Sequence, residues 1–380
     1  MKLKILQENL AKALIVVSRS VATKSSIPIL TNFLITAKKG VLEIYGTDFD
    51  IFAKISVGAE VEEEGRICVS AKNFTDLVSL LPSGILEVNT EKENLVVNSS
   101  RGKTTFSTSI ADDYPETFSL GKDNKPIMSF LVSDFNKLVD KTTFSTDKQK
   151  ARPIFTGVYF DFVANGLNAV ATDGNRLSKC FVEGEQGKNE NMSIPSDALD
   201  ELSKTIHDLG EIPEDKVEIH MVNNQAIFKY RNAELAARLI EGVFPDYKVV
   251  IPSENKFTVK VMKVELLQAL RISGIFTRSL SVPKVTLTFD FKSSKLLFLA
   301  EASEVGQNNT DVDMEVMSDA DEIKTTFNAK NIQDALSHIS TETVVLNGFE
   351  NKRNPGAIGL VMMENDNPDF LHMMVPFYPA

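Results

Sequence analysis

Three pairs of segments in this sequence resemble each other at one constant offset of 125 residues. The matched segments begin at Leu6 and Leu131, at Leu42 and Leu167, and at Val69 and Ile194. The second pair reads LEIYGTDFD and LNAVATDGN, so that a Thr-Asp pair ends an apolar run in both copies. An offset shared by independent matches indicates a duplicated structural unit, and such a repeat restricts the possible folds more than composition does.

A third, less regular copy follows the first two. VMKVELLQAL from Val261 matches the segment from Leu6, and FNAKNIQDAL from Phe327 matches the segment from Val69. In the third copy Glu301 and its neighbour replace the Thr-Asp pair. The chain is therefore predicted to contain three related domains of similar length.

The predicted domain boundaries lie in polar segments that contain proline, KDNKP at 122–126 and PSENK at 252–256. These segments divide the chain into domains over 1–125, 126–253 and 254–380. Within each domain, helical spacing of apolar residues alternates with strand-like segments bounded by turn signals. Each repeat is thus predicted to be an α+β domain with two helices packed on a mostly antiparallel sheet.

The composition is that of an ordinary soluble protein, with 43% hydrophobic and 24% charged residues. The sequence contains no apolar run of about 18 residues, the length of a membrane span, and we predict a cytoplasmic protein without membrane contact. The apolar cluster at 13–17 follows Lys12 and is interpreted as a helix face. Cys68 and Cys180 are too few for a disulfide framework and are predicted to be buried, reduced thiols.

The net charge of −11 argues at first against a nucleic-acid partner, but the positive charge is concentrated. The first helix of each repeat with its flanks, residues 1–24, 131–152 and 259–279, carries +4, +2 and +3. The rest of the chain then carries −20. A positive net charge on all three equivalent helices predicts a basic face suited to sequence-independent phosphate contact. The second helix of the middle repeat is acidic and breaks this pattern.

The sequence contains none of the short motifs that indicate common catalytic or cofactor sites. It lacks the phosphate-binding glycine loops and the Gly-x-Ser-x-Gly elbow. Its four histidines and two cysteines do not have metal-ligand spacing. We therefore predict a binding protein that is not an enzyme and has no metal or cofactor.

Four segments resemble one known family: SIPILTNFLI at 26–35, TDGNRL at 172–177, IEGVFPDYKVVIP at 240–252 and MMVPFYPA at 373–380. With the threefold repeat they resemble the bacterial DNA sliding clamps, the beta subunits of DNA polymerase III, over the whole chain. The resemblance implies three domains of the DNA-clamp fold and a ring of two chains joined head to tail. Helices would line the ring around duplex DNA, and antiparallel sheets would form its outer wall.

The resemblance also implies a function and a set of partners. The protein would confer processivity on the replicative DNA polymerase and would tether clamp loader and repair proteins through short peptides. Binding to DNA would be independent of sequence, and a separate loader would open the ring.

Candidate site residues follow from the matching motifs and from the basic first helices. The resemblance gives a partner-peptide pocket of Phe155, Thr172, Gly174, Asn175, Arg176, Leu177, Pro245, Val249, Val375, Pro376 and Phe377. The predicted DNA-facing residues are Lys12, Lys24, Lys137, Lys141, Gln149, Arg152, Lys263 and Arg271. The predicted dimer interface pairs Lys72 and Phe106 of one chain with Ile275 and Phe276 of the other.

Alternative functions stay open at the level of sequence. Asn175 stands where histidine is frequent in the family, and Val249 stands where arginine is usual. Such departures fit a plasmid, phage or duplicate clamp with different partners. Two further alternatives are an enzyme whose site the sequence conceals and a repeat-built scaffold without a DNA role.

Overall fold

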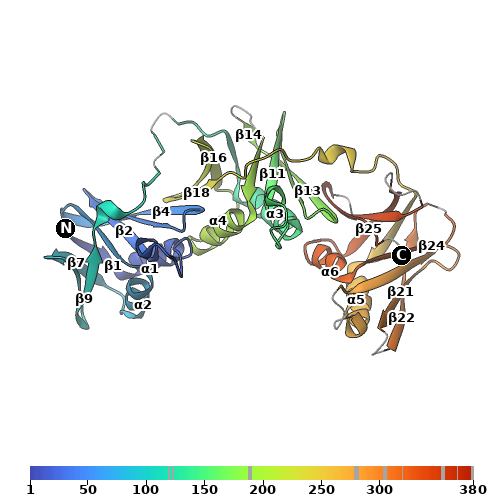
Figure 1. Ribbon diagram of the computed structural model, residues 1–380, viewed down its shortest axis with the longest axis horizontal. Helices are drawn as coiled ribbons and strands as arrows, with labels where there is room; N and C mark the ends of the chain where they lie inside the picture. Colours follow the sequence, from blue (N-terminus) through green and yellow to red (C-terminus); the bar gives the residue numbers. More distant parts are fainter. Residues whose placement is uncertain are drawn as a thin grey trace. The chain divides into compact units, whose positions relative to one another are not determined.

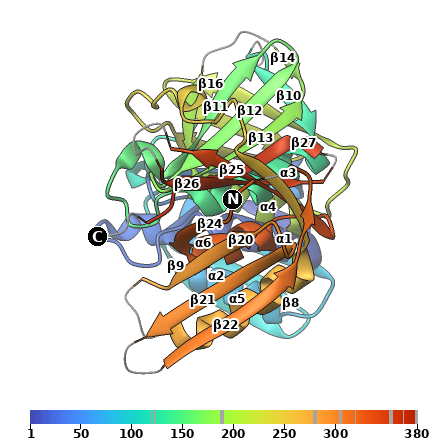
Figure 2. The same cartoon turned by 90° about the vertical axis from the view of Figure 1, so that its right-hand side faces the viewer.

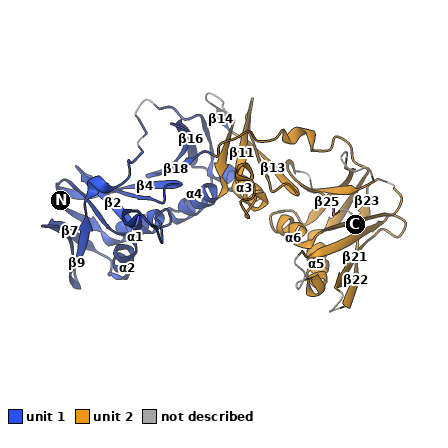
Figure 3. Cartoon of the chain, in the orientation of Figure 1, with its two compact units in different colours: residues 1–136, 184–190, 197–239 blue, residues 137–183, 191–196, 240–380 orange. Residues whose placement is uncertain are grey.

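The structure is a computed structural model that describes residues 1–118, 120–121, 124–186, 191–277, 282–302, 306–318, 320–351, 356–365 and 367–377. These form two compact units (Figure 3). Unit 1 comprises Met1–Asn136, Gly184–Glu190 and Asp197–Leu239, and unit 2 comprises Lys137–Glu183, Asn191–Ser196 and Ile240–Ala380. The border between the units runs inside the predicted middle domain, so the division into three domains stays a prediction.

Helices occur in pairs along the chain, as the repeat predicts (Figure 1). The α-helices are α1 (Gln7–Ser18), α2 (Ala71–Leu80), α3 (Val132–Thr142), α4 (Ser196–Asp208), α5 (Lys263–Thr277) and α6 (Ala329–Ser337). Short 3-10 helices are η1 (Pro28–Thr31), η2 (Ala111–Asp113), η3 (Thr143–Ser145), η4 (Pro153–Phe155) and η5 (Tyr247–Val249).

Equivalent positions of the repeat have equivalent burial. Leu10 on α1, Phe135 on α3 and Leu266 on α5 are all buried, as their alignment in the three copies predicts. On α1 the apolar stripe continues through Leu14 and Val17, which are also buried. The 3–4 spacing of these residues places them on one face of a helix, and that face packs on the sheet.

Unit 1 contains one sheet that continues from the first predicted domain into the second. Its strand order is β14 (Glu185–Gln186), β10 (Met128–Leu131), β16 (Lys216–Val222), β17 (Gln225–Tyr230), β18 (Ala233–Arg238), β4 (Ile51–Gly58), β3 (Val41–Thr47), β2 (Asn32–Lys38), β6 (Gly65–Ser70), β9 (Gly102–Ser109), β8 (Asn94–Ser99), β7 (Ile85–Glu91), β1 (Lys2–Leu6) and β5 (Glu60–Glu63). The two predicted domains meet where β18 pairs antiparallel with β4.

Unit 2 contains two sheets. The larger has the order β15 (Met192–Pro195), β11 (Gly157–Val163), β12 (Gly166–Thr172), β13 (Arg176–Glu183), β27 (Asn367–Met374), β26 (Ile358–Glu364), β25 (Thr343–Glu350), β19 (Phe257–Met262) and β23 (Glu315–Val316). The smaller has the order β22 (Gly306–Asp313), β21 (Lys295–Ala302), β20 (Lys284–Asp290) and β24 (Ile323–Asn328), and Figure 2 shows its strands side by side. The antiparallel pairing of β13 with β27 joins the predicted middle and third domains.

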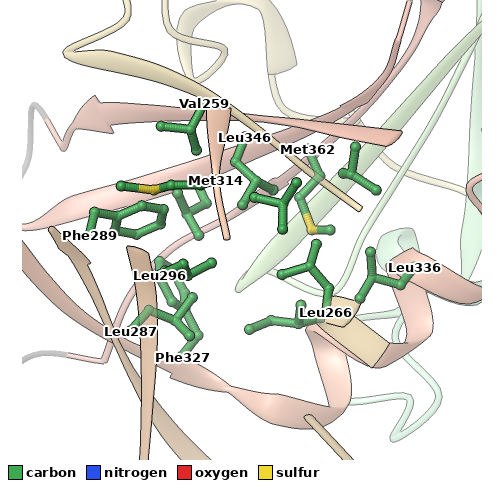
Figure 4. Close-up of a cluster of buried hydrophobic side chains, with 14 of the residues drawn as sticks. Val259, Leu266, Leu287, Phe289, Leu296, Met314, Phe327, Leu336, Leu346 and Met362 are labelled. Carbon is green, nitrogen blue, oxygen red and sulfur yellow. The ribbon is translucent and has the colours of Figure 1, made fainter. Parts of the chain in front are cut away.

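The third predicted domain has a core between its two sheets and its two helices. Figure 4 shows Leu266 of α5 and Leu336 of α6 directed toward side chains of the strands, among them Phe289 and Leu346. Complete burial of such a side chain contributes about 1.5–3 kcal/mol to folding. This core therefore fixes α5 and α6 on the sheets.

The expectation about the two cysteines has a structural counterpart. Cys68 and Cys180 are free and buried, as predicted, and burial raises the pKa of each thiol to about 12. None of the helices in the described ranges has the length and apolar content of a membrane span.

Candidate functional site

The corner between β12 and β13, residues 172–176, is held by its own side chains. The Thr172 hydroxyl donates a hydrogen bond to the Arg176 carbonyl (2.6 Å) and accepts one from the Gly174 N–H (3.0 Å). Asp173 Oδ1 accepts the N–H groups of Asn175 (2.8 Å) and Arg176 (3.1 Å). Gly174 has φ +94°, a region that disfavours residues with a Cβ. The Thr-Asp-Gly sequence thus supplies both the hydrogen bonds and the backbone freedom of this corner.

Arg176 attaches this corner to two other elements of unit 2. Its Nε donates to Asp173 Oδ2 (3.0 Å), and its Nη1 donates to Asp334 Oδ2 on α6 (2.9 Å). Its Nη2 donates to the carbonyl of Phe144 in η3 (2.8 Å). The residue is only 9% exposed, so these bonds replace the water that its guanidinium loses. An arginine after the turn therefore has a structural role as well as a place beside the cavity described next.

Unit 2 contains a cavity of about 670 Å³ beside the corner. It lies between residues 172–177, the segment 244–254, the end of β25 and the end of β27. Nine of the predicted pocket residues line it: Phe155, Thr172, Gly174, Asn175, Arg176, Leu177, Pro245, Val249 and Val375. A cavity of this volume is within the range of small-ligand and peptide-anchor sites.

Aromatic side chains form part of the cavity wall and its support. Phe155 meets Phe244 edge to face with ring centroids 5.9 Å apart, and Tyr159 stacks on Phe244 at 4.6 Å. The Tyr247 hydroxyl donates to Asp161 Oδ2 (2.6 Å), and burial together with this carboxylate raises the pKa of Tyr247. These contacts hold the segment 244–254 against β11.

The sequence interpretation missed several lining residues, including Phe244, Phe349 and Met373. Phe244 lies within the quoted segment 240–252, so its motif contained a usable signal. Met373 begins the quoted segment 373–380, so its motif also contained a signal, and it pairs in register with Leu177 across β13 and β27. Phe349 belongs to β25 and reads in the sequence as an ordinary strand residue.

The end of the chain corrects one part of the predicted pocket. The Val375 N–H donates to the Asn175 carbonyl (3.0 Å), which keeps Val375 at the cavity. Phe377 then turns to β24, where its N–H donates to the Thr326 carbonyl (2.8 Å). Neither Pro376 nor Phe377 is among the lining residues. The rest of the predicted tail, residues 378–380, lies outside the described residues.

Family models match three consecutive parts of the chain. They describe the N-terminal domain of the DNA polymerase III beta subunit over residues 1–118, its central domain over 131–246 and its C-terminal domain over 248–376. The chain belongs to the DNA polymerase III beta subunit family.

Individual relatives of this family cover the chain almost completely. The beta sliding clamp of Halalkalibacterium halodurans is 28% identical over 374 residues, 95% of each chain. The solved structure of the Bacillus subtilis sliding clamp has a TM-score of 0.91 at 22% identity and full coverage of both chains. The Pseudomonas aeruginosa sliding clamp bound to griselimycin has a TM-score of 0.89 at 24% identity, also with full coverage. The predicted DNA-clamp fold is therefore confirmed.

Most of the residues predicted to face DNA have accessible side chains. Lys12, Lys24, Gln149, Arg152 and Arg271 are exposed. Two others are partly engaged: Lys137 Nζ lies 3.2 Å from Asp369 Oδ2, and Lys263 Nζ donates to the Ile339 carbonyl (2.7 Å). Arg278, counted in the third basic segment, lies outside the described residues. Arg152 also lines the cavity of unit 2.

Lys141 does not fit the DNA-facing set, and this prediction is corrected. The residue is 3% exposed, and its Nζ lies 2.6 Å from Glu364 Oε1 and 3.0 Å from Ser340 Oγ. It also donates to the carbonyl of His338. Burial opposes ionisation of Glu364, but the hydrogen bonds from Lys141, Ser340 N–H and Asn367 outweigh it and lower the pKa of that carboxyl. This ammonium pairs within unit 2 and is not available to a phosphate.

The acidic helix that broke the charge pattern has a partner in unit 1. Arg19, just after α1, donates to Glu201 and to Asp208 on α4, and Nη2 lies 3.3 Å from Thr205 Oγ1. The acids on α4 thus compensate one of the cations counted in the first basic segment.

The predicted dimer-interface residues lie on both units. On unit 1, Lys72 is exposed on α2, and Phe106 on β9 is half-buried with its ring edge to face with Phe74 (5.7 Å). On unit 2, Ile275 is 58% exposed on α5 and Phe276 is half-buried. Their pairing between two chains stays a prediction.

In the described ranges, no His, Cys, Asp and Glu side chains are grouped so that they could hold a metal ion.

Proposed function

We propose that the chain performs the DNA sliding-clamp role of its family as a ring of two copies closed around duplex DNA. The observation that carries this proposal is the exposure of Lys12, Lys24, Gln149, Arg152 and Arg271 on a chain whose net charge is −11. These residues suit contact with phosphates, which carries no sequence information. Processivity then comes from topology, because a closed ring cannot leave DNA that has no end.

The ring would form by head-to-tail contact between the first domain of one copy and the third domain of the other. A heterologous contact closes into a ring when its rotation allows. Exposed Ile275 and half-buried Phe106 provide apolar surface for such a contact.

The cavity of unit 2 would bind short peptides of the replicative polymerase, the clamp loader and repair proteins. Its apolar wall and its few polar groups suit the capture of hydrophobic side chains from an extended segment. In this proposal the chain has no catalytic activity of its own and acts in the cytoplasm, where the DNA is.

Retention on circular and linear DNA tests the ring. The protein, loaded on nicked circular duplex by a clamp loader, should remain bound at moderate salt and leave when the circle is linearised. Simple phosphate binding would weaken with salt on both forms alike. Equal loss from both forms would reject the ring. Phe106→Asp serves as the control, because a charge in the interface should prevent closure.

A specialised copy with altered partners is a second candidate, favoured by Asn175 and Val249 at the cavity. Titration with peptides from the host's replicative polymerase and from its repair polymerases distinguishes the two. A general clamp should bind the replicative peptide at least as tightly as the others, whereas a specialised copy should prefer another.

A further inference from the structure

We propose that the cavity of unit 2 selects peptides that carry lysine or arginine beside their apolar anchor residues. This inference rests on the proposed function, in which the cavity takes partner peptides. It concerns the charge around the cavity, which is a property of this chain's own residues. We call the exposed carboxylates Asp246 and Glu254 the acidic rim.

The charges that line the cavity do not balance. The described lining residues include two arginines, Arg152 and Arg176, and three carboxylates, Asp246, Glu254 and Glu350. The charge of Arg176 is compensated by ion pairs with Asp173 and Asp334, which lie outside the lining set. Among the described lining residues, Arg152 is then the one cation left against three carboxylates.

The two members of the acidic rim keep their charge available to a ligand. Asp246 accepts the N–H of Lys248 (3.0 Å), but the Lys248 ammonium lies 3.0 Å from Asp161 Oδ2 and is committed there. Glu254 is exposed and forms no ion pair with any described residue. Glu350 Oε1 accepts the Gly356 N–H (3.0 Å), and residues 352–355 beside it lie outside the described residues. We therefore build the inference on the rim alone.

The apolar part of the cavity and the acidic rim belong to the same segment of chain. Val249, 65% exposed between the two rim residues in sequence, lines the cavity without adding charge. Leu177 and Met373 supply apolar lining from the paired strands β13 and β27. A peptide with apolar anchors and a neighbouring cation would satisfy both parts, whereas an acidic flank would meet like charge.

Two peptides with one apolar core and either two flanking lysines or two flanking glutamates test the inference by calorimetry. We expect about fivefold tighter binding of the lysine peptide at low salt, the size of one to two exposed ion pairs. The preference should shrink as ionic strength rises, because exposed charges are screened. Equal binding of both peptides, or a preference for glutamate, would overturn the inference and leave the peptide pocket itself intact.

Substitution of the two acidic-rim residues tests whether they cause the preference for the lysine peptide. The double variant Asp246→Asn, Glu254→Gln should bind both peptides within about twofold of each other. Glu322→Gln, which neutralises an exposed carboxylate that does not line the cavity, is the matched control and should keep the preference. A preference that survives in the double variant would place its origin elsewhere and reject the acidic rim. If no peptide binds at all, the proposed function of the cavity fails and the inference fails with it.

Discussion

Two corners of this chain, residues 47–51 and 172–176, have the same internal hydrogen bonds at equivalent places in the repeat. In the first corner the Thr47 hydroxyl donates to the Ile51 carbonyl (2.9 Å) and accepts the Phe49 N–H (2.9 Å). Asp48 Oδ1 accepts the N–H groups of Asp50 (3.0 Å) and Ile51 (2.9 Å). The second corner repeats each of these bonds with Thr172 and the residues after it.

The two corners differ at three positions; one difference places Asp50 opposite Asn175, and the other two bear on the site. Gly174, at φ +94°, lines the cavity, whereas Phe49 adopts φ +80° at the equivalent position and is 40% exposed. Arg176 binds Asp334 on α6, whereas the equivalent Ile51 carries no charge. The Thr-Asp corner is therefore shared architecture, and the residues placed on it make one copy into a site.

Arg176→Ile, which gives the second corner the residue of the first, should have the largest effect. It leaves Asp334 and the Phe144 carbonyl without their donor, and it should lower the free energy of unfolding by about 2–3 kcal/mol, allowing for partial exposure of Asp334. Denaturant melts measure this. The stability of Arg176→Lys should lie between that of the unchanged protein and that of Arg176→Ile, because an ammonium keeps the charge but lacks the planar fork of a guanidinium. A loss below about 0.5 kcal/mol would mean that the ion pairs contribute little.

Gly174→Phe should close the cavity while the corner still forms, since Phe49 shows that the corner accepts a phenylalanine at positive φ. A Cβ at position 174 would lie 3.4 Å from Arg152 Nη1 and 4.0 Å from Phe155 Cε2. We expect peptide affinity to fall about 30-fold, which corresponds to about 2 kcal/mol. Circular dichroism and thermal melting serve as the folding control. Unchanged affinity would show that peptides do not approach position 174.

Thr47→Val and Thr172→Val test whether the shared hydrogen bonds contribute equally. Each removes a hydroxyl that both donates and accepts, and each should cost about 1–2 kcal/mol. The fully buried Thr47 should show the larger loss. Native-state hydrogen exchange of the two corners measures the effects separately. A larger loss at Thr172 would indicate that the second corner depends more on its own bonds.

Phe49→Gly should have the smallest effect and the opposite sign. Phe49 has a positive φ, and replacing it with glycine should remove about 1 kcal/mol of backbone strain from the folded state. The greater conformational freedom of glycine in the unfolded chain offsets part of this gain in stability. We expect a gain of about 0.5 kcal/mol in thermal unfolding. Destabilisation would show that the exposed ring makes packing contacts that outweigh the strain.

The repeat and the buried helix faces could be predicted because they rest on local spacing. Leu10, Phe135 and Leu266 lie in alignable segments, and their burial follows from helical periodicity. The Thr-Asp corner also rests on local sequence, because its hydrogen bonds join residues no more than four positions apart.

The errors concern residues whose partners lie far away in the sequence. Lys141 reads as a basic residue on a basic helix, but it is buried and its ammonium pairs with Glu364, more than 200 residues later in the chain. Phe377 lies only two residues after the lining residue Val375, but its N–H donates to the Thr326 carbonyl of β24. Periodicity and charge counts contain no information about such long-range partners.

The continuity of the sheets has a mechanical consequence. Five residue pairs join β18 to β4, and five join β13 to β27. A force that slides one of these strands along its neighbour loads several backbone hydrogen bonds at once, so the joint resists shear as a ladder rather than as a single contact. Tension applied to the chain should therefore separate side-chain contacts before it ruptures either of these two joints.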